Sequence, residues 1–128
     1  MTNPRIHRLG DLQLKIMKAL WDRSEATVSQ VHQTVSPDAG LAHSTIATML
    51  RKMEARGLVK HRLLDRKFLY RALVREDVVA RKMSEHFIER LFEGSLADMV
   101  SHLLKTQDIS RQELERLEKL IAEQKRKL

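Results

Sequence analysis

The spacing of apolar residues constrains the fold of this 128-residue sequence more than any other feature, because one pattern holds almost throughout. Over most of the chain apolar residues recur every three or four positions, as on one face of an α-helix. Only between residues 59 and 72 do apolar and polar residues roughly alternate, as in strands with one buried face. The pattern therefore predicts a mainly α-helical (α+β) fold with one two-stranded antiparallel hairpin.

Residues typical of helix ends set the expected bounds of the elements. Thr27 and Gln30 match the Thr-x-x-Gln pattern of a capping box, which opens a second helix. Pro37 disfavours helix in the residue before it, so we expect this helix to close at Ser36 and a loop to cover 36–42. The expected helices cover about 9–23, 27–35, 43–56, 75–94, 96–104 and 110–128.

The alternating segment predicts strands at Val59–Leu63 and Phe68–Ala72 around Asp65-Arg66. Asp-Arg lacks the glycine that makes a two-residue turn easy, so we expect a looser loop of about three to five residues. The alternation also predicts that Phe68 and Tyr70 face the core.

The net charge of +7 lies entirely in the N-terminal part of the chain. Residues 1–74 hold 13 Lys and Arg against 6 Asp and Glu, whereas residues 75–128 hold 11 against 11. An excess confined to one segment predicts a basic domain, 1–74, joined to a neutral one, 75–128. Such a basic domain is either a solvated surface or a surface that binds nucleic acid.

The helix expected over 43–56 carries the most specific local signal. Ile46, Met49, Leu50 and Met53 share one face. The opposite face is small, hydroxylated and basic, and its candidate DNA-binding residues are Ser44, Thr45, Ala47, Thr48, Arg51 and Lys52. Short side chains let a helix enter the major groove, where hydroxyl and basic groups bond to base edges and phosphates.

The order of the elements supports that interpretation. Two helices, a loop and the 43–56 helix follow one another as in a helix-turn-helix, and the hairpin stands where a winged variant has its wing. Arg62, Arg66 and Lys67 near the hairpin tip are candidates for phosphate contacts. We therefore predict a winged helix-turn-helix that binds double-stranded DNA.

The C-terminal segment predicts a second copy of the chain as partner. Ser110 and Glu113 form a capping box that opens the last of three amphipathic helices. These helices carry more apolar surface than 54 residues can bury among themselves, which predicts a helical dimerisation region and a homodimer. The candidate dimerisation residues are Phe87, Leu91, Leu103, Leu114, Leu117 and Ile121.

Several classes of protein have no support in the sequence. There is no Cys, and no phosphate-binding loop or nucleophile motif is present, so we expect neither an enzyme nor a cofactor. We predict no metal site, because no metal-ligand spacing is found among His7, His32, His43, His61, His86 and His102. No apolar run exceeds three residues, so we expect a cytoplasmic protein without a membrane contact. Trp21 is expected to anchor the core or a domain interface.

Two other functions remain open at this point. Charge alone does not distinguish duplex DNA from RNA, so an RNA- or ribosome-associated basic module is the alternative. Such modules usually stack bases on paired aromatic rings, and only Phe68 and Tyr70 lie in the hairpin. The third candidate is a winged helix that makes only protein contacts.

The sequence also resembles a known family. Leu9-Gly-Asp-Leu-Gln-Leu-Lys-Ile-Met-Lys-Ala-Leu-Trp21, Thr27-Val-Ser-Gln-Val-His32 and Leu41-Ala-His-Ser-Thr-Ile-Ala-Thr-Met-Leu-Arg-Lys-Met53 are similar to the penicillinase repressor family (BlaI/MecI/CopY type). The resemblance continues through Gly57-Leu-Val59 and Tyr70 to Leu91-Phe-Glu-Gly-Ser95 and the last helix. It implies a homodimeric winged-helix repressor of dyad-symmetric operators, with recognition helix 44–52 and wing 58–72.

The chain departs from parts of the family pattern. Copper-sensing members carry a cysteine-rich tail, which the absence of Cys excludes here. In β-lactam-responsive members a sensor protease cuts an Asn-Phe pair, and the position that looks equivalent here is His102-Leu103. Ala47 stands where some relatives have a longer polar residue. The resemblance therefore transfers neither the operator sequence nor proteolytic induction, and a sensor protease or other inducing signal is not identified.

Overall fold

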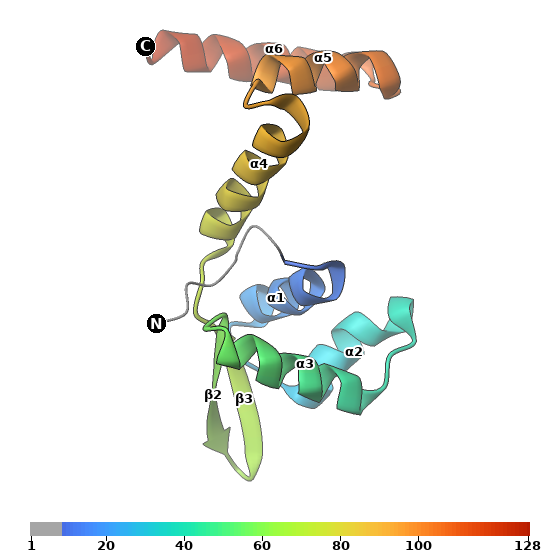
Figure 1. Cartoon of the computed structure of the whole chain (residues 1–128), viewed down its shortest axis with the longest axis vertical. Coiled ribbons are helices and arrows are strands. Elements are labelled where there is room, and N and C mark those ends of the chain that lie inside the picture. The colour runs from blue at the N-terminus through green and yellow to red at the C-terminus, as the bar shows by residue number, and fades with distance from the viewer. Residues whose placement is uncertain (1–8) are drawn as a thin grey trace. The chain divides into compact units, whose positions relative to one another are not determined.

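The computed structural model describes residues 9–128 (Figure 1). The elements are α1 (Asp11–Arg23), β1 (Ala26–Thr27), α2 (Val28–Ala39), α3 (His43–Ala55), β2 (Val59–Leu64), β3 (Lys67–Ala72), α4 (Glu76–Phe92), α5 (Leu96–Thr106) and α6 (Arg111–Arg126). The predicted fold class, mainly helical with a small antiparallel sheet and a winged helix, is confirmed. The chain divides into two compact units, and the division falls inside α4, between His86 and Phe87.

The hydrophobic core of the first unit draws on all of its elements. The side chains that are fully or almost fully buried in it include Ile16, Met17, Leu20, Val31, Ile46, Leu50, Met53, Leu58, Val59, Tyr70 and Val79. Each large apolar side chain buried in this way contributes about 1.5–3 kcal/mol relative to an exposed one. This burial fixes which face of each helix points to solvent.

Helix α2 begins where the sequence predicts and ends later. The capping box is confirmed, because the Thr27 side chain accepts from the Gln30 amide at 3.2 Å and Gln30 Oε1 accepts from the Thr27 amide at 2.9 Å. The predicted stop at Ser36 is wrong, since the helix includes Pro37 and ends at Ala39. Gly40 then ends the helix in the left-handed region, at φ 61°, and its N–H donates to Ser36 O at 2.8 Å.

The sheet has one strand more than predicted and a tighter turn. Its order is β1-β3-β2, and the short β1 pairs with β3. Leu64 pairs with Lys67, so the connection is a two-residue turn and the expected looser loop is wrong. Asp65 and Arg66 both lie in the left-handed region, at φ 49° and 64°, as in the type I′ turn that matches strand twist. The turn therefore forms without glycine, at a cost in backbone strain at Arg66.

The two aromatic residues of the wing differ in burial. Tyr70 is 2% exposed and belongs to the core, as predicted, whereas Phe68 is 48% exposed. The prediction for Phe68 is wrong because β3 begins beyond the edge of the core. Phe68 lies two residues nearer the tip than Tyr70 on the same face, where its ring packs against His61 and not in the core.

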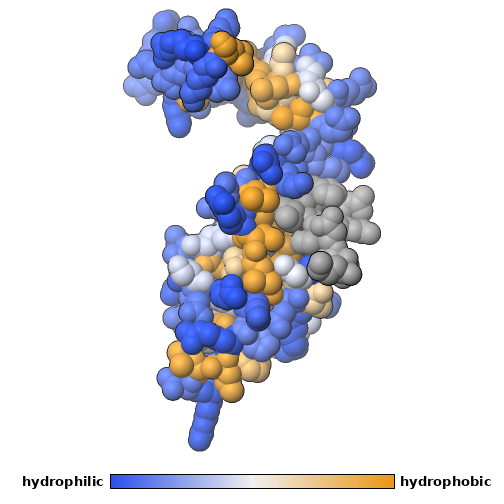
Figure 2. Space-filling view, turned by 90° about the vertical axis from the view of Figure 1, so that its left-hand side faces the viewer, coloured by the Kyte–Doolittle hydropathy of each residue, from blue (hydrophilic) through white to orange (hydrophobic). Residues whose placement is uncertain are grey.

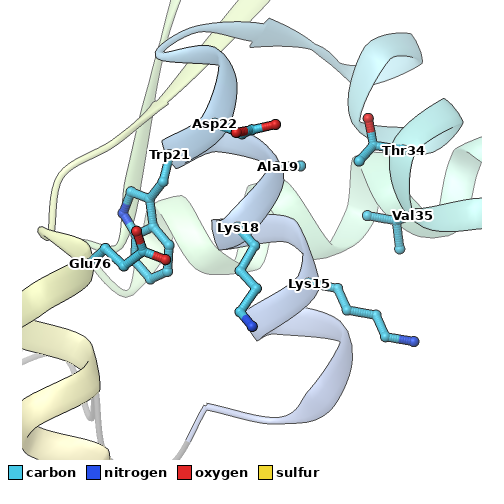
Figure 3. A pocket seen from close by; sticks show the side chains of 8 residues that line it. All are labelled: Lys15, Lys18, Ala19, Trp21, Asp22, Thr34, Val35 and Glu76. Atoms are coloured by element: carbon cyan, nitrogen blue, oxygen red, sulfur yellow. The ribbon is translucent and has the colours of Figure 1, made fainter. Parts of the chain in front are cut away.

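Trp21 joins α1 to the segment before α4. Its Nε1 donates to Val74 O at 2.9 Å. Figure 3 shows the indole pointing from α1 toward Glu76, the first residue of α4. Trp21 is half-buried and packs against the core, so it anchors the start of α4 to the first unit.

The second unit consists of the end of α4 with α5 and α6, and it has little interior. Ser95 and Ser110 cap α5 and α6, each accepting from a backbone N–H at 3.1 Å. No residue between 87 and 128 is buried. No helix in the described part of the chain is long and apolar enough to cross a membrane.

The strained turn generates a stability prediction. Arg66→Gly should raise the free energy of unfolding of the first unit by about 0.5–1 kcal/mol, because glycine adopts φ > 0 without a Cβ clash. Urea unfolding followed by Trp21 fluorescence measures the change. Arg66→Ala is the control, since it keeps the Cβ, and an equal gain from both variants would contradict the explanation.

Candidate nucleic-acid interface

Helix α3 presents two chemically different sides. Ile46, Leu50 and Met53 are fully buried, and α3 packs against α2 and β2. Five of the six predicted contact residues on α3 are exposed together, namely Ser44, Thr45, Thr48, Arg51 and Lys52. The sixth, Ala47, is half-buried. The exposed side of α3 therefore combines hydroxyl groups and cations on side chains that begin short and lengthen along the helix.

The exposed side of α3 is slightly hollowed. A depression of about 250 Å³ is lined by Ser44, Thr45, Thr48, Met49 and Lys52. Nη2 of Arg51 donates to Oγ1 of Thr48 at 3.2 Å, which holds the guanidinium beside the hydroxyl. Hydroxyl and guanidinium groups placed together can bond to base edges and to phosphate oxygens.

Hydrogen bonds at the α2–α3 connection fix where α3 begins. Nε2 of His32 donates to Leu41 O at 2.7 Å, and Oγ of Ser36 donates to the same oxygen at 3.0 Å. His43, the first residue of α3, shares a hydrogen bond of 3.2 Å with Ser29 of α2. The connection therefore holds the N-terminal end of α3 at a defined place on α2.

The wing, defined as β2, β3 and their turn, places Arg66 and Lys67 at its tip. Both side chains are exposed, and among the described residues neither forms an ion pair. The wing also exposes Lys60, Arg71 and Arg62, the last of which is described below. Asp65 is the only acidic residue of the wing. The wing is thus a cationic projection suited to phosphate oxygens.

Arg62, the third basic residue predicted near the tip, is paired with an acidic residue. Its Nε and Nη2 lie 2.7 and 3.0 Å from the two carboxylate oxygens of Glu25, in a bidentate arrangement. The hydrogen bond from Arg62 lowers the pKa of Glu25 against a smaller opposing effect of desolvation, and the charges of Arg62 and Arg71 lower it further. The same pair raises the pKa of Arg62. The guanidinium of Arg62 is therefore engaged by the carboxylate of Glu25.

A second side-chain hydrogen bond connects the wing to α3. Nδ1 of His61 on β2 lies 2.6 Å from Oε1 of Glu54 on α3. The His61 ring also packs against the rings of Phe68 and Tyr70, with centroids 4.4 and 5.3 Å apart. Burial, and then the charge of Glu54, raise the pKa of Tyr70, while Arg51 lowers it. The wing and α3 thus form one surface rather than two independent ones.

The sequence did not predict the two acidic partners, Glu25 and Glu54. The predicted strands already place His61 opposite Tyr70, as observed, but that register does not show which residue of α3 lies next to His61. No signal exists for Glu25 either, whose approach to Arg62 depends on the short strand β1.

The predicted dimerisation residues lie on the second unit. Phe87, Leu91, Leu103, Leu114 and Ile121 are exposed, and Leu117 is half-buried. They belong to a larger set of exposed apolar residues that also includes Leu96, Leu104, Leu120 and Leu128. Within the second unit, no described residue covers this apolar surface.

Other candidate sites have weaker support. A hollow of about 480 Å³ lies between α1, α2 and the start of α4, and its lining includes two lysines, Lys15 and Lys18, and two acidic residues, Asp22 and Glu76 (Figure 3). Within residues 9–128, no three His, Asp or Glu side chains gather closely enough to hold a metal ion. His7 lies outside the described residues.

Comparisons with known proteins identify the family of this chain. A family model described as penicillinase repressor matches residues 9–123. The penicillinase repressor of Bacillus licheniformis is 27% identical over 121 residues, 94% of this chain and 94% of that protein. Transcriptional regulator BlaI of Mycobacterium tuberculosis is 31% identical over 121 residues, 93% of this chain and 86% of that protein. The solved DNA-binding domain of the repressor BlaI is similar with a TM-score of 0.51 and 28% identity, covering 59% of this chain and 90% of that domain.

The Glu25–Arg62 pair generates a prediction for DNA binding. Glu25→Gln should strengthen duplex binding by roughly two- to fivefold and steepen its salt dependence by about 0.9 per subunit, because a released Arg62 can pair with a phosphate. Fluorescence anisotropy titrations at several salt concentrations measure both quantities. Asp22→Asn removes one exposed negative charge without releasing an arginine and is the control. The idea fails if Arg62→Ala does not abolish the gain in the Glu25→Gln background.

Proposed function

The chain belongs to the penicillinase repressor family and is a DNA-binding transcriptional repressor, and from this premise we propose that it binds dyad-symmetric operators as a homodimer. The observation that carries the proposal is the exposed side of α3, where short hydroxyl side chains and two cations stand opposite a fully buried face. A helix of this kind fits the major groove.

Each candidate residue of the interface has a proposed role. Ser44, Thr45, Ala47 and Thr48, near the N-terminal end of α3, face base edges, where hydroxyls bond and methyl groups meet thymine. Arg51 and Lys52, one turn further on, reach a guanine or the backbone. Phosphate contacts beside the groove are assigned to Arg62, Arg66 and Lys67.

The second unit supports the homodimer. Residues 87–128 have no buried side chain, although their helices carry many leucines. A second copy would present the same apolar surface, so a two-fold contact covers both at once. Two α3 helices related by that axis would enter major grooves about 10 base pairs, or a multiple, apart.

Repression would follow from occupancy alone. A bound dimer excludes polymerase from overlapping promoter elements, and this requires no chemical step. The family to which the chain belongs is not enzymatic, and the described residues offer phosphate- and base-binding groups on a rigid helix.

The proposed phosphate contacts predict a steep salt dependence. Affinity for a duplex that the protein itself selects from a randomised library should fall by roughly 10³-fold or more between about 50 and 200 mM salt. Arg51→Ala with Lys52→Ala should weaken binding and flatten this dependence. Structured RNA at equal salt is the competitor control. An affinity that does not change with salt, or equal competition by the RNA, would contradict the proposed DNA interface.

The proposed dimer predicts the effect of a charge in the apolar stripe of α6. Leu117→Asp or Ile121→Asp should shift the protein toward the monomer and weaken operator binding steeply, because each half-site alone binds weakly. Sedimentation velocity measures the oligomeric state. Gln112→Asp puts the same charge on the opposite side of α6 and should leave the dimer intact. An unchanged dimer in the Leu117 and Ile121 variants would refute the assignment of this surface.

A further inference from the structure

Two exposed apolar side chains lie face to face near the tip of the cationic wing. Leu63 is 65% exposed and Phe68 is 48% exposed, and the two residues are paired across β2 and β3. Figure 2 shows hydrophobic surface on the wing close to its tip. Neither side chain belongs to the core. Phosphate contacts alone give no reason for an apolar pair at this place.

The strand register shows which way the pair faces. Side chains alternate along a strand, so Leu63 and Phe68 share one face of the wing with His61 and Tyr70. Tyr70 enters the core, and His61 contacts Glu54 of α3. The face that carries Leu63 and Phe68 is therefore continuous with the surface of α3.

The opposite face of the wing supplies a matched position. Leu64 is the next residue along β2 and is 44% exposed, but it points to the other side, as Arg62 does. The chain thus offers two neighbouring exposed leucines of which only one lies on the α3 side.

We propose that Leu63 and Phe68 make an apolar contact with the minor-groove wall of the duplex that α3 enters. This inference rests on the proposed function, because it needs α3 in the adjacent major groove. Proteins that contact the minor groove commonly use Leu and Phe side chains against sugars and base steps. The pair extends the interface from hydrogen bonds and phosphate contacts to a desolvated apolar contact.

Charge selects the duplex over other occupants of this surface. Arg66 and Lys67 lie at the tip next to Leu63 and Phe68, and within residues 9–128 neither cation forms an ion pair. A second wing would carry the same cations to the contact and be repelled. A DNA duplex offers phosphates that pair with the cations and deoxyribose groups that contact the apolar pair.

An apolar contact has a thermodynamic signature that distinguishes it from a phosphate contact. Burying a leucine releases no condensed counterions, so its loss lowers affinity without changing the slope of log affinity against log salt. Losing a phosphate contact lowers both the affinity and the steepness of that slope. The two kinds of contact can therefore be separated in one set of titrations.

The test compares Leu63→Gln with Leu64→Gln in the full-length protein. The probe is the duplex that the wild-type protein selects from a randomised library of about 30 base pairs, labelled for anisotropy at several salt concentrations. Leu63→Gln should weaken binding roughly tenfold at unchanged slope, and Phe68→Gln should act in the same direction. Leu64→Gln should bind within about twofold of wild type. Circular dichroism and urea unfolding check that all three variants fold alike.

Several results would overturn the inference. Equal effects of Leu63→Gln and Leu64→Gln would show a general effect on the wing, and a slope reduced by Leu63→Gln would show a lost phosphate contact. A third such result is a Leu63→Gln variant that binds the duplex as the wild type does but represses transcription poorly in vitro. That result would show that Leu63 and Phe68 contact a protein partner. Failure of the proposed function would give different results. The wild-type protein would then select no duplex, or the double variant Arg51→Ala with Lys52→Ala would retain full affinity.

Discussion

The burial of one face of α3 is the constraint on which the rest of the interface depends. Ile46, Leu50 and Met53 are fully buried, which leaves the helix no freedom to rotate about its axis. A rotation would expose these side chains at a cost of several kcal/mol and bury hydroxyls and cations. The orientation of Thr48 and Arg51 toward solvent is therefore a consequence of the core. No contact on the exposed side is needed to maintain it.

The acidic residues of the first unit have a geometric role beyond their effect on net charge. Glu54 ties His61 of the wing to α3, and Glu25 ties Arg62 to the segment before β1. Exposed ion pairs contribute little free energy, so these pairs reinforce a direction of the wing that the strand register and the buried Val59 and Tyr70 already set. Neither pair involves Arg66 or Lys67, which form no ion pair with any described residue, so the cations at the tip remain available to an anionic partner.

Apolar spacing predicted those parts of the fold that burial alone decides. The 43–56 helix and its exposed face follow directly, since α3 covers His43–Ala55 with three of the four expected residues, Ile46, Leu50 and Met53, fully buried and the fourth, Met49, half-buried. Local preferences failed where packing or caps overrode them, as at Pro37 inside α2 and at the glycine-free turn. The pairs made by Glu25 and Glu54 join residues that are distant in sequence, so no periodicity reveals them. The exposure of Phe68 required knowing where the core ends.

The weakness of the second unit in isolation has a thermodynamic consequence in the proposed dimer. Its exposed leucines gain cover only in the partner's presence, so folding of this unit and dimerisation are linked. Joining two subunits turns the second half-site contact into an intramolecular event, with an effective concentration set by the geometry of the dimer. Operator affinity then depends steeply on the dimer contact. A signal that separates the subunits would release the operator while Thr48, Arg51 and the wing remain unchanged.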